Sequence, residues 1–489
     1  MINSARTDAE GELISGYLKG DDFKMPMSLV YLLIMLAVIC VWFVLMKRPI
    51  WESMGLAFLV LVAVTGTWGS LWSFVDKGLS TSLLYSMVVF ICMSAIMTKT
   101  KIIDGAVNFI LALLGRLPGG AGYAAVVASG FMGALSGSGP GNVMSTGVIT
   151  IKAMKESGYP PELAANLESN ASYLGNMIPP SSNIVAALGA LTAFWAAQGV
   201  EDTMAIGSFW VVCWGCSLWF ILARLITVFV FVKYYRIRPM EESKIPDMKE
   251  TFRNNWQGLL LPVVILLPFI VDFFFNNTTS FPDMAVFVDR LGKAGAKSYS
   301  GALLYFVAGI AAIYAIVVML FKDRSAISPR KIIKMLSGSA KGIASTVGTC
   351  LFGYMIGALF TQIEATAELG TFLESLSMGY VGLALVIPLI TCFMGMVIPG
   401  SSLVSIFGTL FISLFFAQGA NPVLIAAMLP CFCGVMCGIT PPLALGMYAG
   451  MSIAESDPGK TIKNDLWWVA AQYIVEVIVL LGWLPILGL

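Results

Sequence analysis

The feature that most constrains this chain is an apolar stretch, Phe131 to Gly189, which is interrupted twice. The first interruption is the Gly/Ser-rich run Ser136–Asn142, and the second is the pair Pro179-Pro180. Glycine and proline are poor residues for the interior of a packed helix. In a lipid bilayer, irregular backbone persists only where protein or a water-filled cavity satisfies its polar groups. Apolar segments broken in this way indicate a transport site near the middle of a membrane.

The composition supports a membrane protein. Hydrophobic residues make up 58% of the sequence and charged residues 12%, with a mean hydropathy of +0.85, whereas soluble domains carry about 25% charged residues. The sequence has no histidine, the commonest metal ligand. We interpret the nine cysteines as apolar-facing thiols, because no ligand loop flanks them. The net charge of +1 predicts no nucleic-acid partner. The fold class is therefore an all-α polytopic membrane protein.

Hydropathy predicts the elements in chain order. We expect a flexible polar tail over residues 1–27 and no signal peptide, because no basic region precedes a short apolar core. The expected spanning helices, hairpins, broken helices and amphipathic segments are Met27–Met46, Glu52–Trp72, Ser82–Thr98, amphipathic Lys101–Leu117, hairpin Gly122–Met154, broken helix Pro161–Ala197, Met204–Val232, Trp256–Phe275, Gly301–Phe321, Lys341–Gln362, amphipathic Ile363–Ser377, hairpin Gly379–Phe416, broken helix Pro422–Ala454 and Trp467–Leu487.

The pattern of the broken stretch occurs a second time. Phe131-Met132-Gly133 recurs as Phe393-Met394-Gly395, and Pro179-Pro180 recurs as Pro441-Pro442, both at an offset of 262 (393 − 131 and 441 − 179). Further pairs match at an offset of 261, namely Gly147 with Gly408, Gly158 with Gly419, Pro161 with Pro422 and Gly189 with Gly450. Several matches in order at nearly one offset indicate an internal repeat.

Loop charges predict the orientation of the two copies. Basic clusters such as Lys47–Arg48, Lys152/Lys155 and Lys460/Lys463 fall on one side when both hairpins are re-entrant, and that side is cytoplasmic by the positive-inside rule. Both termini are then outside. The segment before the first hairpin is basic, whereas the segment before the second is acidic, with Glu364, Glu368 and Glu374. The two copies therefore enter the membrane from opposite faces, which is the inverted-topology repeat of many alternating-access transporters.

The two hairpin tips and helix breaks supply the candidate ligands. Loose carbonyls and hydroxyls suit a dehydrated Na⁺, and the N-termini of half-helices suit an anion. For Na⁺ we predict Ser136, Ser138, Gly175, Ile178, Pro179, Gly400, Ser401, Gly438 and Thr440. For a substrate we predict Ser136, Asn142, Ser145, Thr146, Pro180, Ser181, Ser182, Asn183, Ser402 and Pro442.

Three ionisable residues fall within predicted spans, where such residues are functional candidates. Glu168 either carries a coupling proton, as an alternative to Na⁺ coupling, or pairs with a neighbour. Arg224 and Glu476 are candidates for a structural ion pair.

At these residues the chain resembles the large membrane subunit of tripartite ATP-independent periplasmic (TRAP) transporters, and it looks most like the TAXI-type branch within the ion transporter superfamily. The resemblance covers roughly Glu52 to Leu489. The motifs that carry it are Leu114-Gly115-Arg116-Leu117-Pro118-Gly119-Gly120, Ser136-Gly137-Ser138, Asn142-Val143, Pro161-Glu162, Glu168, Pro179-Pro180, Gly438-Ile439-Thr440-Pro441-Pro442, Tyr448-Ala449-Gly450 and Asp457-Pro458.

The resemblance implies an elevator-type transporter with a mobile transport domain and a scaffold. The implied division is a tail (1–27), scaffold helices with a first arm helix (28–120), transport domain half 1 (121–198), scaffold helices with a second arm helix (203–378), transport domain half 2 (379–454) and a C-terminal helix (466–489). It also implies a bacterial or archaeal cytoplasmic (inner) membrane. The implied partners are a soluble periplasmic substrate-binding protein and a small four-helix membrane subunit, expected here as a separate chain.

The function expected from both arguments is import of a small organic acid, such as a dicarboxylate, 2-oxoacid or amino-acid-like compound, coupled to Na⁺ or H⁺. The alternative within transport is a stand-alone ion-coupled carrier of the same fold. A passive channel would show flux without gradient coupling. An intramembrane enzyme has little support, because the sequence has no HExxH-type motif and no paired carboxylates within a span.

Overall fold

The computed structural model describes residues 26–80, 82–100, 102–136, 139–200, 206–276, 286–322, 328–338, 340–365, 368, 371, 378–396, 400–440 and 444–489. These residues form a helical bundle, which confirms the all-α prediction. The elements are α2 Met27–Ile39, η1 Cys40–Leu45, α3 Ile50–Thr65, η2 Trp68–Ser70, α4 Leu71–Leu79, α5 Ser82–Thr100, α6 Ile102–Leu114, α7 Gly120–Ser136, α8 Gly139–Glu156, α9 Pro161–Leu174, η3 Gly175–Met177, α10 Ser182–Ala197, α11 Ile206–Tyr235, η4 Glu242–Lys244, α12 Met248–Leu259, α13 Leu261–Asn276, α14 Val286–Lys322, α15 Pro329–Gly338, α16 Ala340–Gln362, α18 Tyr380–Gly395, α19 Gly400–Ala417, α20 Pro422–Leu429, η6 Pro430–Val435, α21 Met436–Ile439, α22 Leu445–Ala454 and α23 Pro458–Leu480.

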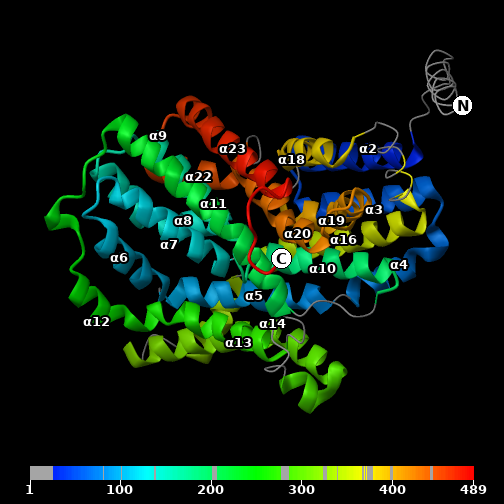
Figure 1. Ribbon diagram of the computed structural model, residues 1–489, viewed down its shortest axis with the longest axis horizontal. Coiled ribbons are helices and arrows are strands. Elements are labelled where there is room, and N and C mark those ends of the chain that lie inside the picture. Colours follow the sequence, from blue (N-terminus) through cyan, green and yellow to red (C-terminus); the bar gives the residue numbers. More distant parts are fainter. Residues whose placement is uncertain are drawn as a thin grey trace, which may run out of the picture.

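The two broken helices cross at their breaks. The first consists of α9, η3 and α10, and the second of α20, η6, α21 and α22. The first half of one helix packs against the second half of the other, so that α9 lies beside α22 and α20 lies beside α10 (Figure 1). The short segments η3 and η6 meet between them.

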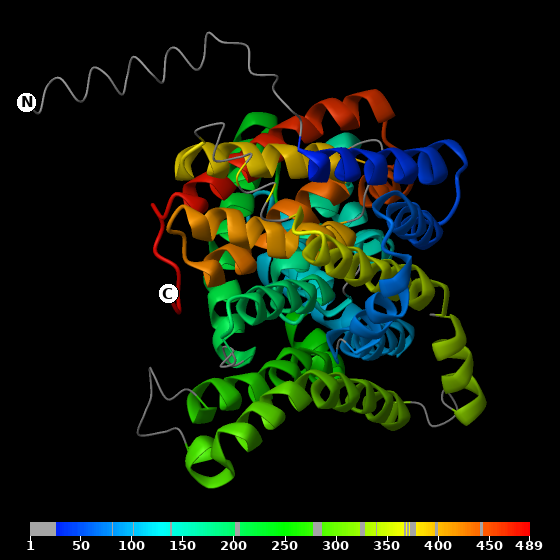
Figure 2. The same cartoon turned by 90° about the vertical axis from the view of Figure 1, so that its right-hand side faces the viewer.

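Each hairpin packs beside one side of the crossing. The helices α7 and α8 pack on each other and on α9, and α19 packs on α10, α20 and η6 (Figure 1). Outside this core, α13 and α14 pack together along one side of the molecule, visible in green in Figures 1 and 2, and α5 connects them to it.

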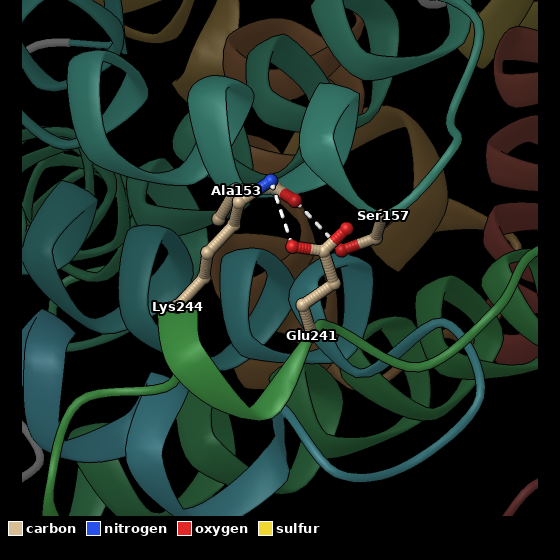
Figure 3. A network of polar contacts seen from close by, with 4 residues as sticks. All are labelled: Ala153, Ser157, Glu241 and Lys244. Atoms are coloured by element: carbon tan, nitrogen blue, oxygen red, sulfur yellow. Dashed lines mark hydrogen bonds and ion pairs between the residues drawn. The ribbon is translucent and has the colours of Figure 1, made fainter.

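The linker between α11 and α12 is hydrogen-bonded to the segment that precedes the first hairpin. The N–H of Met240 donates to Gly115 O at 3.1 Å, and η4 lies near the end of α8 (Figure 3). There Lys244 and Glu241 form an ion pair of 3.2 Å, while Ser157 Oγ donates to Ala153 O at 2.7 Å. The ion pair is largely exposed, so it contributes little to stability.

Several predicted boundaries were wrong. Glu52–Trp72 is not one helix, because Gly66 adopts a φ of 68° and ends α3 at Thr65. The last helix begins at Pro458 instead of Trp467, since Asp457 caps the N–H of Lys460 at 2.8 Å and proline suits the first helical position. Sequence reasoning also missed the amphipathic helices α12 and α15. The expected tail and most of the segment Ile363–Ser377 lie outside the described residues.

Six helical stretches among the described residues are long and apolar enough to cross a membrane. The first broken helix, Pro161–Ala197, is one of them, and 83% of its most apolar window is buried inside the protein. Protein therefore surrounds most of this segment, which is what irregular backbone at membrane depth requires.

Glu368 caps α2, the first described helix, from far along the sequence. Its carboxylate accepts hydrogen bonds from Met27 N (2.9 Å), Ser28 N (3.0 Å) and Ser28 Oγ (2.5 Å). The Ser28 hydroxyl and then the two amides stabilise the ionised form, so the pKa of Glu368 is lowered from its ordinary value.

We therefore expect the start of α2 to loosen in acid. A carboxyl whose pKa is lowered in the folded state stabilises the contact above its ordinary pKa and loses this effect as the pH falls through the lowered value. Limited proteolysis near Met27 should be faster for Glu368→Ala than for the wild type at neutral pH, and the two rates should converge in acid. The exposed Glu364→Gln is the matched control. Equal rates at all pH values would contradict the prediction.

Candidate functional site

The repeat found in the sequence is also present in the backbone. Ile178 (φ −95°, ψ 124°) and Thr440 (φ −91°, ψ 127°) end the first halves of the two broken helices in almost the same extended conformation. Each precedes a proline, which disfavours helix at the preceding residue. Gly158 and Gly419 both adopt positive φ, 90° and 84°, and are followed by helices that begin with proline.

The glycines of the Phe-Met-Gly motifs explain why that motif is repeated. A Cβ on Gly175 would come well under 3.0 Å from the backbone of Gly133. In the second copy, a Cβ on Gly395 would collide with Cys437, the residue 262 positions after Gly175 (437 − 175). Each hairpin helix therefore approaches its own break with a glycine at the contact, and this packing holds hairpin and break together.

The two breaks meet at Gly434, in the π-helical segment η6. Asn176 Nδ2, from the first break, donates to Gly434 O at 3.2 Å. A Cβ on Gly434 would lie 3.2 Å from Asn183 Nδ2, and a Cβ on Gly400 would come well under 3.0 Å from Gly434 Cα. Gly434 is thus where the first break, the start of α10 and the start of α19 come together. Single π-helical turns are frequent at functional sites.

Two polar side-chain atoms on α10 and α19, which pack against each other here, have no hydrogen-bond partner among the described residues. They are Asn183 Oδ1 and Ser402 Oγ, whose residues are 5% and 0% exposed. Both residues belong to the predicted substrate set. Because a buried polar atom without a partner costs about 1–3 kcal/mol, the pair marks a place where a ligand or water would bind.

Tyr173 fills the space beside the meeting point, and sequence reasoning missed it. Its ring occupies the positions that side chains at Gly139, Gly438 and Gly446 would need. It therefore separates the start of α8 from the second break. The signal that could have revealed it is the placement of glycines on both sides, which leaves room for a large ring.

Glu168 lies in a network of hydroxyl groups. Its Oε1 accepts from Thr146 (2.7 Å) and Ser172 (3.0 Å), and its Oε2 accepts from Thr150 (2.5 Å). Asn142 Nδ2 extends the network to Ser129 O (2.8 Å) and Ser172 Oγ (2.9 Å). All of these residues are buried, and none of the hydrogen-bond partners of Glu168 is charged.

The structure joins some predicted site residues and separates others. Asn142 and Thr146 face Glu168 along α8, whereas Ser145 is half-buried next to the exposed Met144. Ser181 caps α10 by accepting from Ile184 N at 3.3 Å and donates to Asn176 O. Pro180, in a cis peptide bond with Pro179, and Ser182 are buried beside it.

The predicted Na⁺ ligands lie at the two breaks and tips. Gly175, Ile178, Pro179, Gly438 and Thr440 are buried, and Gly400 and Ser401 are half-buried at the start of α19. Thr440 Oγ1 donates to Met436 O at 2.9 Å, and Ser401 O accepts from Ser405 Oγ at 2.9 Å. Ser138, Pro442 and the side chain of Ser136 lie outside the described residues.

The expected ion pair between Arg224 and Glu476 was wrong. Both side chains are buried, but among the described residues Arg224 forms no ion pair within 4.0 Å. Glu476 Oε1 instead accepts from Gln472 Nε2 at 3.0 Å and from Cys431 Sγ at 3.2 Å, and the Arg224 guanidinium lies 5.6 Å from the centre of the Trp468 ring. The two residues share one buried region without touching.

Two solved structures share this fold. The chain resembles the structures of MtrF from Neisseria gonorrhoeae (TM-score 0.62, 15% identity, 87% of each chain covered) and of the YdaH transporter from Alcanivorax borkumensis (TM-score 0.55, 15% identity, 93% of this chain and 98% of that one). At this identity the likeness shows the fold alone.

Curated relatives are large permeases. The chain is 22% identical over 397 residues to the C4-dicarboxylate TRAP transporter large permease protein DctM of Pseudomonas aeruginosa, covering 81% of this chain and 83% of that protein. It is 25% identical over 421 residues to DctM of Vibrio cholerae, covering 83% and 86%. The sialic acid TRAP transporter permease protein SiaT of Haemophilus influenzae is 23% identical over 77% of this chain and 58% of that protein. These relatives are named as transporter permeases, not as enzymes.

The family model described as the DctM component of the tripartite ATP-independent periplasmic transporter matches residues 32–487. With the repeat, the crossing helices and the two breaks, this match accounts for nearly the whole chain. The protein therefore belongs to the DctM family of TRAP transporter large permeases.

Proposed function

We propose that this large permease imports a small organic acid and binds it where the two broken helices meet around Gly434. The observation that carries the proposal is the buried Ser402 hydroxyl, whose unpartnered Oγ can donate to a carboxylate, together with the unpartnered Asn183 Oδ1, an acceptor that suits a hydroxyl or amine of the substrate. They lie near the N-termini of α10 and α19, whose partial positive charges favour an anion. The relatives named for C4-dicarboxylates, sialic acid and isethionate support an acidic substrate.

Coupling to Na⁺ is the second part of the proposal. The carbonyls and hydroxyls at Ser136, Ser138, Gly175, Ile178, Pro179, Gly400, Ser401, Gly438 and Thr440 provide oxygen ligands at both breaks, in line with sites formed by unwound helices in other transporters. The alternative is H⁺ coupling through Glu168, supported by its burial among hydroxyl groups. In either case the hairpins are re-entrant, the two copies are inverted in a cytoplasmic membrane with both termini outside, and the transport domain moves as an elevator.

The partners follow from the same proposal. A periplasmic binding protein delivers the substrate, and a small membrane subunit completes the transporter. One relative, the isethionate TRAP transporter permease protein DctMQ of Oleidesulfovibrio alaskensis, is 32% identical over 147 residues. Its name adds the letter Q to that of the DctM relatives. We propose a separate small subunit here, and membership of the TAXI-type branch.

The substrate site is tested by Asn183→Ala and Ser402→Ala. Ser402→Ala should reduce uptake of a labelled C4-dicarboxylate or another acid from a screened panel by about tenfold or more, because a hydrogen bond to a charged group contributes about 1.5–3 kcal/mol. Asn183→Ala removes a neutral acceptor and should reduce uptake by a smaller factor. Thermal stability should not fall, since both atoms already lack partners. The matched control is Ser413→Ala on α19, whose hydroxyl is already satisfied by Thr409 O at 2.9 Å. Wild-type uptake in both variants would refute this site.

The tripartite arrangement and the coupling ion are tested in liposomes. The chain with its small subunit and binding protein should accumulate substrate against a gradient, and removing the Na⁺ gradient should abolish accumulation. Ser401→Ala should weaken the Na⁺ dependence. Full uptake by this chain alone would support the stand-alone carrier, and flux without accumulation would support a channel.

A further inference from the structure

A second buried polar cluster lies away from the meeting point of the breaks, on the inner face of α23. Asp465, Trp468, Gln472 and Glu476 follow one another at spacings of three or four residues and are all buried. This spacing places them along one side of the helix. Arg224 of α11 is 1% exposed, and its guanidinium lies 5.6 Å from the centre of the ring of Trp468, which stands between Asp465 and Glu476 along α23. The cluster therefore contains one cation and two acids in a buried region.

The cluster touches both broken helices. Asp465 Oδ1 accepts from Asn170 Nδ2 of α9 at 3.0 Å, and Glu476 Oε1 accepts from Cys431 Sγ of η6 at 3.2 Å. Glu168 is also on α9, but two residues from Asn170, which turns it about 200° around the helix. Consequently Glu168 faces α8 while Asn170 faces α23, and the two acidic sites are separate.

Many polar side-chain atoms in and next to the cluster have no hydrogen-bond partner within the described part of the chain. The donors are Arg224 Nε and Nη2 and Trp468 Nε1. The acceptors are Asn166 Oδ1, Asn170 Oδ1, Asp465 Oδ2, Gln472 Oε1 and Glu476 Oε2. Buried polar groups without a protein partner are typically hydrogen-bonded to buried water.

Charge balance decides the protonation of the cluster. Arginine remains charged in proteins, so Arg224 contributes one positive charge. The other titratable groups that interact with Glu476 are the thiols of Cys392, Cys431, Cys433 and Cys437 and the phenol of Tyr473; thiols and phenols are mostly uncharged at neutral pH. A buried net charge costs several kcal/mol. The neutral arrangement has one acid ionised and the other protonated.

We propose that Asp465 and Glu476, which lie about 16 Å apart along α23, hold a single proton, with one acid protonated and the other ionised against Arg224, and so form a proton-binding site of this permease. Its contacts with α9 and η6 connect the site to both breaks. Anything that binds at the breaks and shifts these segments changes the proton affinity, and the proton changes that binding by the same factor. The site can therefore couple pH to transport independently of Glu168.

The test is infrared spectroscopy of the purified full-length protein, because a protonated carboxyl group has a carbonyl band that a carboxylate lacks. Because Glu168 is present in the wild type and in every variant, its contribution cancels in the difference spectra between them. Asp465→Asn and Glu476→Gln should each remove the same single band, since the remaining acid is then ionised against Arg224. The exposed Glu455→Gln should remove none.

Other outcomes overturn the proposal. If neither variant removes a band, both acids are ionised; if each removes a different band, both are protonated. Arg224→Met gives a second measurement: without the cation both acids become neutral, so the band intensity should rise about twofold. The double variant Asp465→Asn/Glu476→Gln should melt at a lower temperature than either single variant, and adding Arg224→Met should reverse this loss. These readouts do not depend on transport, so they remain informative if the proposed substrate site is wrong.

Discussion

Glu168→Leu is expected to lower the free energy of unfolding by about 3 kcal/mol, because it leaves several buried hydroxyl donors without their shared acceptor. Thr146, Thr150 and Ser172 all donate to this carboxylate. The loss is limited, since Thr146 and Thr150 also lie within hydrogen-bonding distance of carbonyls on their own helix, at 2.9 Å and 3.1 Å. Thermal unfolding in detergent measures the effect.

The conservative variant separates stability from coupling. Glu168→Gln keeps the shape and one acceptor, so it should be less destabilising than the leucine. If Glu168 carries the coupling proton, the glutamine variant should lose its response to a pH gradient in liposomes while it still folds. Glu162→Gln, at the half-exposed start of the same helix, is the matched control. An unchanged response to the pH gradient would exclude the proton role.

Gly175→Ala is expected to destabilise the protein by about 3 kcal/mol, the upper part of the usual range for overpacking. Gly175 has ordinary helical angles (φ −57°, ψ −23°), so alanine meets no conformational penalty there. The cost arises because the new Cβ would overlap the backbone of Gly133 and Ala134, which cannot rotate away. The first hairpin would have to separate from its break.

Two glycines serve as comparisons for Gly175. Gly395→Ala should cost less, because its closest obstacle, Cys437 Sγ at 2.1 Å, can rotate away, and the backbone atom it would meet, Cys437 Cα at 2.9 Å, is less close than Gly133 C, which lies 2.2 Å from a Cβ on Gly175. Gly309→Ala in α14 meets nothing within 4 Å, and alanine is favoured over glycine in a helix by about 1 kcal/mol, so it should be neutral or stabilising. Melting temperatures in this order would support the packing argument. A Gly175→Ala protein as stable as Gly309→Ala would contradict it.

The sequence predicted the architecture well, for local reasons. Runs of apolar residues predict helices, and residues such as Gly158, Gly419, Pro161 and Pro422 act on the backbone at their own positions. The boundary errors arose where the sequence contains a local start or stop signal that the prediction did not use, such as the Asp457-Pro458 start of α23. The predictions that concern membrane orientation, Na⁺ and the elevator remain predictions.

The sequence by itself determined the repeat, the two breaks and the residue types available at each break, because these depend on the order of residues along the chain. Only the tertiary structure decided that Gly434 is where the breaks meet, that Asn183 and Ser402 keep open hydrogen-bonding atoms there, and that Tyr173 fills the adjacent space. Likewise, it replaced the expected Arg224–Glu476 ion pair with a larger cluster that includes Asp465. The physical reason is that these contacts join residues hundreds of positions apart, and their geometry depends on helix crossing and side-chain packing that no local pattern encodes.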